Sequence, residues 1–184
     1  MTTRRTAAPP SRAELVRLLL DSGAVRFGDF TLASGAKSDV YVDVKRAWPD
    51  PARLDLLARA LAEHAGTEGH LAGMELGAVP LVVALALRLG RPYAVLRKAA
   101  KEHGTRQAFE GEIPVGARFL IVEDVTTTGG SVLRSVEIVR GAGGVVDRAL
   151  VVLDREEGAV ERLGDAGVRL EPLLTFSELR KGRS

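Results

Sequence analysis

The sequence predicts an α/β protein with a central, mostly parallel sheet that helices cover on both faces. Short apolar runs at 70–74, 93–97, 118–124 and 145–154 alternate with longer stretches of helical pattern. This alternation is typical of strand–helix–strand units, whose strands lie parallel. The runs are apolar at nearly every position, which is typical of strands buried on both faces.

The residues before this alternation predict a helix followed by two extended segments. Ser11 and Glu14 have the spacing of a capping box, and the helix they open is expected to end near Gly23. Residues 24–44 have an extended pattern with a turn expected in SGAKSD, residues 34–39. Because these residues do not follow the strand–helix alternation, we expect them to form a small hood over the sheet.

Helix signals mark the elements of the α/β part. Asp50 is placed as an N-cap, with Pro51 at the first helical position. After the strand at 70–74, GAVP (77–80) is expected to be a turn. Further helices are expected at 81–89 and 129–144, with a short helix before a strand at 168–174 and a last helix from the capping box at Thr175 and Glu178.

Length and composition favour a single globular domain. The chain has 184 residues, of which 46% are hydrophobic and 27% charged. We expect a mobile basic tail at 1–10 and one domain over 11–184, divided into the hood at 11–48 and an α/β core at 49–184.

The same composition excludes several kinds of function. A formal net charge of +2 gives no argument for nucleic acid or membrane as a partner. No apolar run approaches the roughly 20 residues that span a bilayer. The absence of cysteine excludes disulfides, thiolate catalysis and cysteine-based zinc sites, and it fits a cytoplasmic location.

A polar stretch follows the strand at 118–124. Glu123 and Asp124 come first, and VTTTGGS (125–131) then leads into a helix. Ligands of open parallel sheets bind beyond the carboxyl ends of the strands. A helix start with unpaired N–H groups, glycines and hydroxyl groups is suited to a phosphate. The two acids would repel a phosphate unless they face ribose hydroxyls or a hydrated Mg²⁺.

The stretch therefore predicts a site for a sugar phosphate. It has neither the GK[ST] of a Walker A loop nor a GxGxxG fingerprint. The alternative interpretation is a threonine-rich turn before a helix that binds nothing.

Residues 119–131 resemble the signature with which type I phosphoribosyltransferases bind phosphoribosyl pyrophosphate (PRPP). Three further segments resemble the orotate phosphoribosyltransferase family: RKAAKEHG at 97–104, FTLASGAKSDVYVD at 30–43 and DREEG at 154–158. A weaker likeness covers the turn at 75–78, which contacts pyrophosphate in phosphoribosyltransferases but lacks the lysine that some relatives carry. The likeness implies the type I phosphoribosyltransferase fold.

The resemblance implies an active site in which Glu123 and Asp124 hold the ribose hydroxyls and the residues after them hold the 5′-phosphate. Cations on a glycine-containing loop are suited to the charge that develops on departing pyrophosphate. The alternative is a solvated basic loop. The implied catalytic residues are Lys101, His103 and Asp124. The implied PRPP contacts are Arg97, Lys98, Lys101, His103, Glu123, Asp124, Val125, Thr126, Thr127, Thr128, Gly129, Gly130 and Ser131.

The same resemblance implies an orotate site formed by Ser34, Gly35, Thr127 and Arg155. Arginine is a suitable bidentate partner for the orotate carboxylate; the alternative for Arg155 is a surface position at a helix start. Many family members carry a lysine after the leucine of the FTLASG segment, where this chain has Ala33. The role of that lysine is therefore not transferred.

The implied activity is that of a glycosyltransferase, a pentosyltransferase of pyrimidine (UMP) biosynthesis. It converts orotate and PRPP to orotidine 5′-monophosphate and pyrophosphate with Mg²⁺, which is held mainly through PRPP and not by a set of protein ligands. The resemblance also implies a homodimer with a shared active site.

Two other functions remain open. One is transfer to another base such as a purine, against which Arg155 and the hood argue. The other is a regulator that kept the PRPP site and binds nucleic acid, against which the cationic loop argues.

Overall fold

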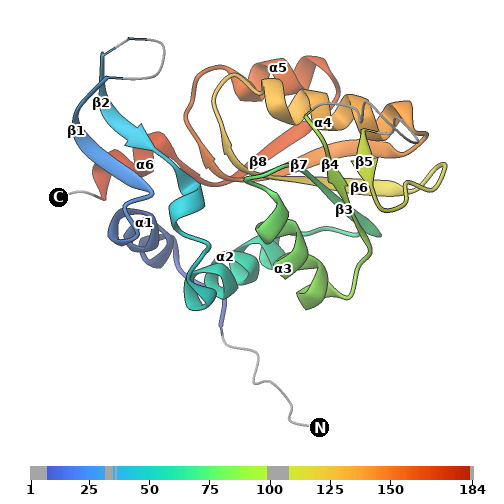
Figure 1. Ribbon diagram of the computed structural model, residues 1–184, viewed down its shortest axis with the longest axis horizontal. Helices are drawn as coiled ribbons and strands as arrows, with labels where there is room; N and C mark the ends of the chain where they lie inside the picture. Colours follow the sequence, from blue (N-terminus) through green and yellow to red (C-terminus); the bar gives the residue numbers. More distant parts are fainter. Residues whose placement is uncertain (1–7, 32–34, 36, 99–107, 183–184) are drawn as a thin grey trace, which may run out of the picture.

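The computed structural model describes residues 8–31, 35, 37–98 and 108–182 of the chain. Its centre is a six-stranded sheet with the strand order β5-β4-β3-β6-β7-β8 (Figure 1). All neighbouring strands are parallel except β4 and β5. The strands are β3 (His70–Met74), β4 (Tyr93–Leu96), β5 (Phe109–Glu110), β6 (Arg118–Thr126), β7 (Val145–Asp154) and β8 (Arg169–Thr175). The predicted α/β class with a mostly parallel sheet is confirmed.

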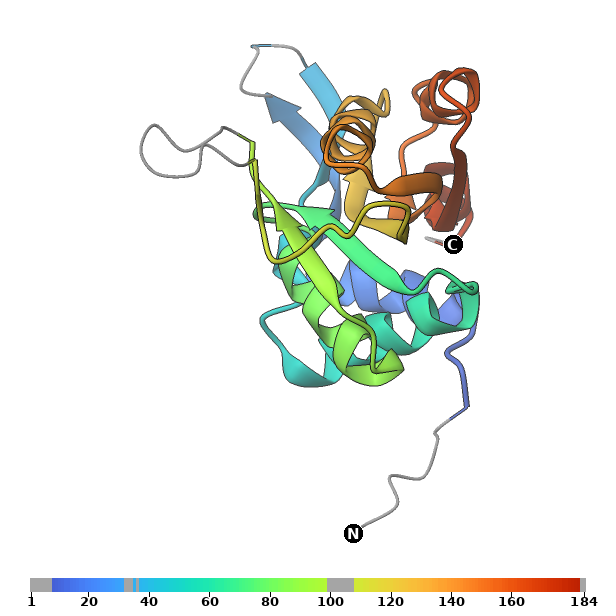
Figure 2. The same ribbon diagram turned by 90° about the vertical axis from the view of Figure 1, so that its right-hand side faces the viewer.

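Helices form a layer on each side of the sheet (Figures 1 and 2). The layer on one face contains α1 (Arg12–Asp21), α2 (Pro51–His64) and α3 (Val79–Leu89). The layer on the other face contains α4 (Gly130–Gly141) and α5 (Ala159–Asp165). Asp50 caps α2 through its side chain, and Ser11 caps α1 in a complete capping box, as the sequence predicts.

Strand β6 shows why the sheet residues are almost continuously apolar. Leu120 and Val122 join the core beneath α2 and α3, whereas Phe119 and Ile121 join the core beneath α4. All four side chains are 0% exposed. Because successive residues of a strand point to opposite faces, a strand covered on both sides must be apolar at every position.

A separate hairpin stands beside the sheet, within the segment 11–48 that was expected to form the hood. It consists of β1 (Val25–Thr31) and the antiparallel β2 (Lys37–Val42), followed by the 3₁₀ turn η1 (Val44–Arg46). The C-terminal helix α6 (Phe176–Lys181) lies against it, as Figure 1 shows. The rings of Phe27 and Phe176 stack at 6.3 Å, and Arg180 donates a hydrogen bond of 2.7 Å to Asp39.

Several predicted boundaries were wrong. Residues 37–39 were expected in the hairpin turn but already belong to β2, in which Lys37 and Ser38 pair with β1. The turn before α3 ends at 78, because Pro80 fits the first turn of a helix. Strand β6 does not stop at Asp124; Val125 and Thr126 continue it, since they pair with β7 opposite Leu153 and Asp154. The two-residue β5 was not predicted, because it is too short to show a strand period.

Candidate active site

The predicted motifs meet at the carboxyl edge of the sheet. The turn 75–78 follows β3, Arg97 and Lys98 follow β4, Glu123 to Ser131 end β6 and open α4, and Arg155 follows β7. From β3 the chain crosses to β4 on one side, and from β6 it crosses to β7 on the other. The neighbouring strands β3 and β6 therefore flank the point where the winding direction reverses, which is the usual ligand site of open α/β sheets.

Glu123 and Asp124 are buried carboxylates at this point, with exposures of 4% and 7%. Oε1 of Glu123 accepts a hydrogen bond of 3.1 Å from the backbone N–H of Asp124. Oε2 of Glu123 accepts one of 2.9 Å from the hydroxyl of Ser131. Oδ1 of Asp124 accepts one of 2.9 Å from the N–H of Val125. The end of β6 thus supplies carboxyl oxygens as hydrogen-bond acceptors, and neighbouring N–H and hydroxyl groups fix their orientation.

Burial, the largest cause, and the neighbouring carboxylate of Asp124 together raise the pKa of Glu123 from its ordinary value of 4.5 to about 8. Two adjacent negative charges in a poorly solvated place repel each other, so the proton is retained on one of them. The raised pKa favours the neutral carboxylic acid form of Glu123. In that form it donates as well as accepts hydrogen bonds, which suits ribose hydroxyls.

Gly77 lies directly against the Asp124 carboxylate. A Cβ at position 77 would be 2.3 Å from Oδ2 and 2.6 Å from Cγ of Asp124, closer than any real contact. The backbone of the turn after β3 therefore packs directly against the Asp124 side chain near the end of β6. Sequence reasoning included this turn only as a weak likeness, and Gly77 has no local signal that would reveal the contact.

The segment after Thr126 forms the expected loop and helix start. Thr126 is 4% exposed and belongs to the strand, whereas Thr127 is half-buried and Thr128 exposed. Gly129 has φ 79° and precedes α4, and no described side chain caps that helix. Its first N–H groups and partial positive charge face the carboxyl edge of the sheet, as a phosphate site requires. The hydroxyl of the predicted contact Ser131 donates to Glu123.

Arg97 and Lys98 are anchored by two acids that sequence reasoning missed. The Arg97 guanidinium donates a hydrogen bond of 3.0 Å to Oε1 of Glu110. The backbone N–H of Lys98 donates one of 2.9 Å to Oε1 of Glu75. Both acids are separated from these cations along the chain, so only the pairing of strands brings them together. The predicted residues Lys101, His103 and Ser34 lie outside the described residues, as does Ala33.

Arg155 lies one residue beyond β7, next to the end of β6. Its backbone N–H donates to the carbonyl of Thr126 at 3.0 Å. Its guanidinium pairs with Glu157 at 2.9 Å, while its Nε is buried without a hydrogen-bond partner among the described residues. A fork with an unsatisfied donor is suited to an additional carboxylate. Gly35, a further described residue of the predicted orotate site, lies between β1 and β2.

Lys45 adds a cation that the motifs did not include. Its ammonium group is 2.7 Å from Oδ1 of Asp43, and this contact raises the pKa of Lys45. The negative charge of Asp124 adds to the same shift. Because η1 packs on β6, the hood brings a positive charge near the acidic pair. In the sequence, only the position of Lys45 shortly after the YVD segment (41–43) could have pointed to this role.

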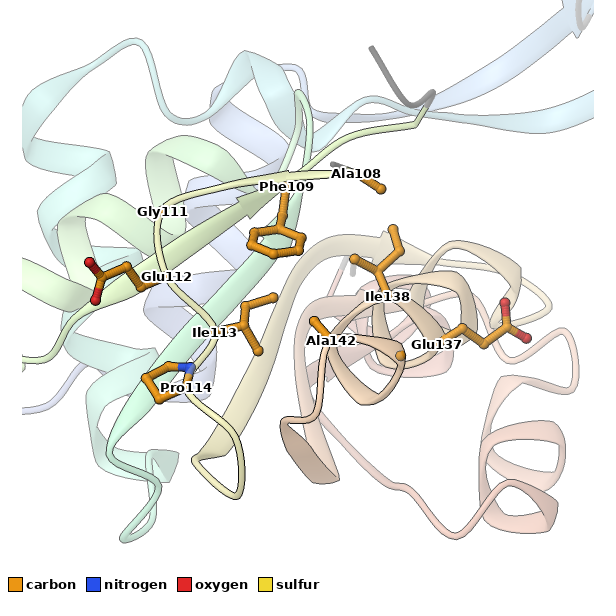
Figure 3. Close-up of a pocket in the computed structure, with 10 residues that line it drawn as sticks. Ala108, Phe109, Gly111, Glu112, Ile113, Pro114, Glu137, Ile138 and Ala142 are labelled. Carbon is orange, nitrogen blue, oxygen red and sulfur yellow. The ribbon is translucent and has the colours of Figure 1, made fainter. Parts of the chain in front are cut away.

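A hollow of about 730 Å³ lies away from these acids, between the segment around β5 and helix α4. Figure 3 shows Phe109, Ile113 and Ile138 facing it, with the carboxylates of Glu112 and Glu137 pointing outward at its margins. Its lining combines apolar side chains with these two glutamates and contains no cation. It is therefore unsuited to a phosphorylated substrate, and the strand ends remain the site that the chemistry supports. Within the described part of the chain, no helix has the length and apolar character to cross a membrane.

The family comparison agrees with the site. Residues 49–171 match the phosphoribosyl transferase domain. This segment contains the acidic pair, the threonine-rich loop and Arg155 at the switch point of the sheet. Fold and site together define the chain as a phosphoribosyltransferase.

Individual relatives narrow the class. The orotate phosphoribosyltransferase of Pyrococcus furiosus is 47% identical over 172 residues, which cover 91% of this chain and 94% of that protein. The crystal structure of orotate phosphoribosyltransferase from Aeropyrum pernix has a TM-score of 0.81 at 38% identity and covers 91% of this chain and 96% of that one. The Mycobacterium tuberculosis H37Rv enzyme in complex with PRPP has a TM-score of 0.78 at 34% identity, covering 93% and 99%. The chain belongs to the orotate phosphoribosyltransferases.

Proposed function

We propose that the chain transfers the ribose 5-phosphate group of PRPP to orotate, giving orotidine 5′-monophosphate and pyrophosphate on the route to UMP. The observation that carries this function is the buried pair Glu123 and Asp124, set between the turn at Gly77 and the uncapped start of α4. This arrangement offers acceptors for sugar hydroxyls beside N–H donors for a phosphate. The family membership agrees with it.

In the proposed reaction, N1 of orotate loses its proton to solvent and forms a bond to the anomeric carbon of PRPP as the bond from that carbon to pyrophosphate breaks. The sugar ring gains positive charge in the transition state. Glu123 and Asp124 hold the ribose hydroxyls, and residues 126–131 hold the 5′-phosphate. Arg97 and Lys98, with the predicted catalytic residues Lys101 and His103, neutralise the departing pyrophosphate. The catalysis consists largely of positioning and electrostatic stabilisation.

Mg²⁺ is the proposed cofactor, bound mainly through the phosphates of PRPP. The residues present fit it, because Asp124 offers the oxygen ligand that Mg²⁺ prefers, directly or through water. Oδ1 of Asp124 accepts a hydrogen bond from the Val125 N–H, which fixes the orientation of the carboxyl group. When bound, the cation would neutralise charge on pyrophosphate. Glu123, whose raised pKa disfavours the charged form, is the less suitable ligand.

Arg155 is the proposed partner of the orotate carboxylate. Its position at the end of β7 places it beside the end of β6, where the ribose would lie. The unsatisfied Nε and the fork of the guanidinium supply the donors that a carboxylate requires. Ser34, Gly35 and Thr127 complete the proposed orotate contacts.

The proposed homodimer, whose two chains share an active site, would form through the exposed surface of α3. Every residue of this helix except Arg88 is apolar, and a helix with so apolar a surface is usually covered by other elements. Yet Leu87 of this helix is 81% exposed, and Leu76 in the turn before the helix is 64% exposed. Pro80, Val83 and Leu87 follow a helical spacing and lie on one face, and Tyr93 at the start of β4 is 41% exposed. A second copy of this chain would cover this apolar strip.

The division into a tail (1–10), a hood (11–48) and a core (49–184) remains a proposal, as does the cytoplasmic location expected from a chain without cysteine.

The direct test is loss of orotate absorbance with the purified chain, PRPP and Mg²⁺. We expect a loss that requires all three components and that nearly vanishes in Asp124→Asn and in Lys101→Ala. Binding of PRPP without loss of orotate would contradict the proposed base, and a panel of purine and pyrimidine bases would then identify another acceptor. Tight DNA binding without turnover of any base would contradict the enzyme itself.

A further inference from the structure

We propose that Glu110 is a positioning residue that holds the Arg97 guanidinium ready for the pyrophosphate group of PRPP. The inference rests on the proposed function, because it assumes that Arg97 contacts PRPP. Glu110 belongs to none of the motifs identified in the sequence. In this proposal Glu110 acts on the substrate through Arg97.

The pairing of β4 with β5 creates this contact. Val95 lies opposite Glu110, and Leu96 lies opposite Phe109. The Arg97 N–H extends the ladder by donating a hydrogen bond of 2.8 Å to the carbonyl of Ala108. Arg97 and Glu110 are therefore diagonal neighbours on one face of an antiparallel pair, within reach of two long side chains.

The contact is between two partly covered side chains. Arg97 is 33% and Glu110 49% exposed, and NH1 of Arg97 is 3.0 Å from Oε1 of Glu110. The Nε of Arg97 is buried without a hydrogen-bond partner in the described part of the chain. The side chain of an arginine just beyond a strand end has many accessible rotamers when nothing binds its guanidinium. The hydrogen bond to Glu110 therefore selects one orientation of the fork.

Lys98 is held through its backbone and not through its side chain, and this difference supports the role proposed for Glu110. Glu75 accepts from the backbone N–H of Lys98, and the N–H of Glu75 donates to the carbonyl of Leu96 at 2.8 Å. These bonds fix the chain where it leaves β4 next to the turn 75–78. The two acids thus have separate roles: Glu75 orients the backbone, and Glu110 orients a side chain.

The expected effect of Glu110 is on binding of the pyrophosphate group. An arginine that is already oriented loses less conformational entropy when it meets an anion, so affinity rises without a new contact. The opposite effect is competition, in which the Glu110 carboxylate occupies the guanidinium and weakens pyrophosphate binding. The two effects predict changes of opposite sign when Glu110 is removed.

The experiment compares Glu110→Ala, Glu110→Gln, Arg97→Ala and the double variant Glu110→Ala/Arg97→Ala. For each, the kcat and both KM values are measured, and Mg²⁺-pyrophosphate binding is measured by calorimetry. For Glu110→Ala we expect the KM for PRPP and the Kd for pyrophosphate to rise by about three- to tenfold. The KM for orotate and kcat should stay near wild type. Glu110→Gln should stay within about twofold, because its amide oxygen still accepts from Arg97.

The double variant tests positioning directly. If Glu110 acts through Arg97, the double variant binds pyrophosphate no worse than Arg97→Ala alone, because the effects of coupled residues do not add. Asp147→Ala is the matched control, since it removes another inter-strand arginine partner, that of Arg118, at the other end of the sheet. It should change neither KM nor Kd.

Several outcomes would overturn the inference. Tighter pyrophosphate binding in both Glu110→Ala and Glu110→Gln would establish competition instead of positioning. Additive losses in the double variant would assign Glu110 a role independent of Arg97. Unchanged pyrophosphate binding in Arg97→Ala would remove the premise. Failure of the wild-type chain to consume orotate would refute the proposed function alone, since calorimetry with pyrophosphate would still test the Arg97–Glu110 pair.

Discussion

The hydroxyl of Ser131 donates a hydrogen bond of 2.9 Å to the carboxyl group of Glu123. This bond joins the end of β6 to the first turn of α4, across the threonine-rich loop. It also satisfies one oxygen of a carboxyl group that burial makes difficult to ionise. Glu123 and Ser131 thus hold together the two ends of the threonine-rich loop. The raised pKa of Glu123 predicts in addition that the stability of the fold depends on pH.

Replacing Glu123 with glutamine should make stability less dependent on pH. Folding raises the pKa of Glu123 from 4.5 to about 8, so between these values the folded protein keeps a proton that the unfolded chain has lost. The unfolding free energy of the wild type therefore falls as pH rises through this window, by at most about 1.4 kcal/mol per pH unit. Urea unfolding of both proteins should show the stability of Glu123→Gln relative to wild type increasing with pH. A constant difference would contradict the raised pKa.

Replacing Gly77 with alanine should displace Asp124. The added Cβ would be 2.3 Å from Oδ2, so the carboxylate must move. Gly77 does not have a positive φ, so the effect is steric and not conformational. We expect kcat/KM for PRPP to fall by at least about tenfold, since small displacements of catalytic groups have effects of this size.

Gly164→Ala is the matched control for Gly77→Ala. Nothing lies within 4 Å of a Cβ at position 164, which is inside α5. Alanine there should raise stability by about 0.5–1 kcal/mol and leave the kinetics unchanged. Equal kinetics for the two variants would show that the contact between Gly77 and Asp124 does not matter for activity.

Arg155→Lys should weaken orotate binding selectively. Lysine keeps the charge but lacks the fork that binds a carboxylate at two points. Loss of one charge-assisted hydrogen bond predicts a rise in the KM for orotate of about tenfold or more, with the KM for PRPP near wild type. Steady-state kinetics with each substrate varied in turn measures both. Arg169→Lys, at the exposed start of β8, serves as the control. A larger effect on PRPP than on orotate would argue against the assignment.

Arg148→Ala should destabilise the fold without changing substrate binding. Arg148 pairs at 2.7 Å with Glu68 and with Glu171 near the amino ends of β7 and β8. The Glu68 side chain is only 4% exposed, and removing Arg148 would leave its charge buried and unpaired. We expect a loss of about 3 kcal/mol of unfolding free energy. The exposed pair of Arg118 and Asp147 should contribute less than about 1 kcal/mol.

This stability prediction is checked by chemical denaturation and by the two KM values. Because the network lies at the end of the strands opposite to the acids, the KM values for PRPP and orotate should not change at temperatures where the variant is folded. A marginal change in unfolding free energy would show that solvent reaches Glu68.

Leu87→Arg should disrupt the proposed dimer. Leu87 is 81% exposed on the apolar strip of α3, where a second copy would desolvate the introduced charge. We expect light scattering to show a monomer and activity to fall sharply, because a shared site is incomplete in one chain. Val160→Arg, which replaces a 51% exposed valine on α5 at the other face, should change neither mass nor activity. A monomeric wild type, or a fully active monomeric variant, would refute the shared site.

Local sequence determined the element types and the position of the acidic motif. The capping boxes at Ser11 and Thr175 predict helix starts that the structure confirms, because capping joins residues three apart. The short, nearly continuous apolar runs likewise predict buried strands, because each run and the helical pattern that follows it can be read from neighbouring residues. Glu123 and Asp124 could be placed at a strand end without knowledge of the neighbouring strands.

The tertiary structure alone decided which residues surround those acids. Contact of Gly77 with Asp124, attachment of Arg97 to Glu110 and the raised pKa of Glu123 all depend on strand order, register and burial. The extension of β6 through Thr126 likewise depends on its pairing with β7. A local pattern specifies that a strand forms and which of its faces are apolar. It does not specify which strand becomes its neighbour, because that choice is made by packing across the whole sheet.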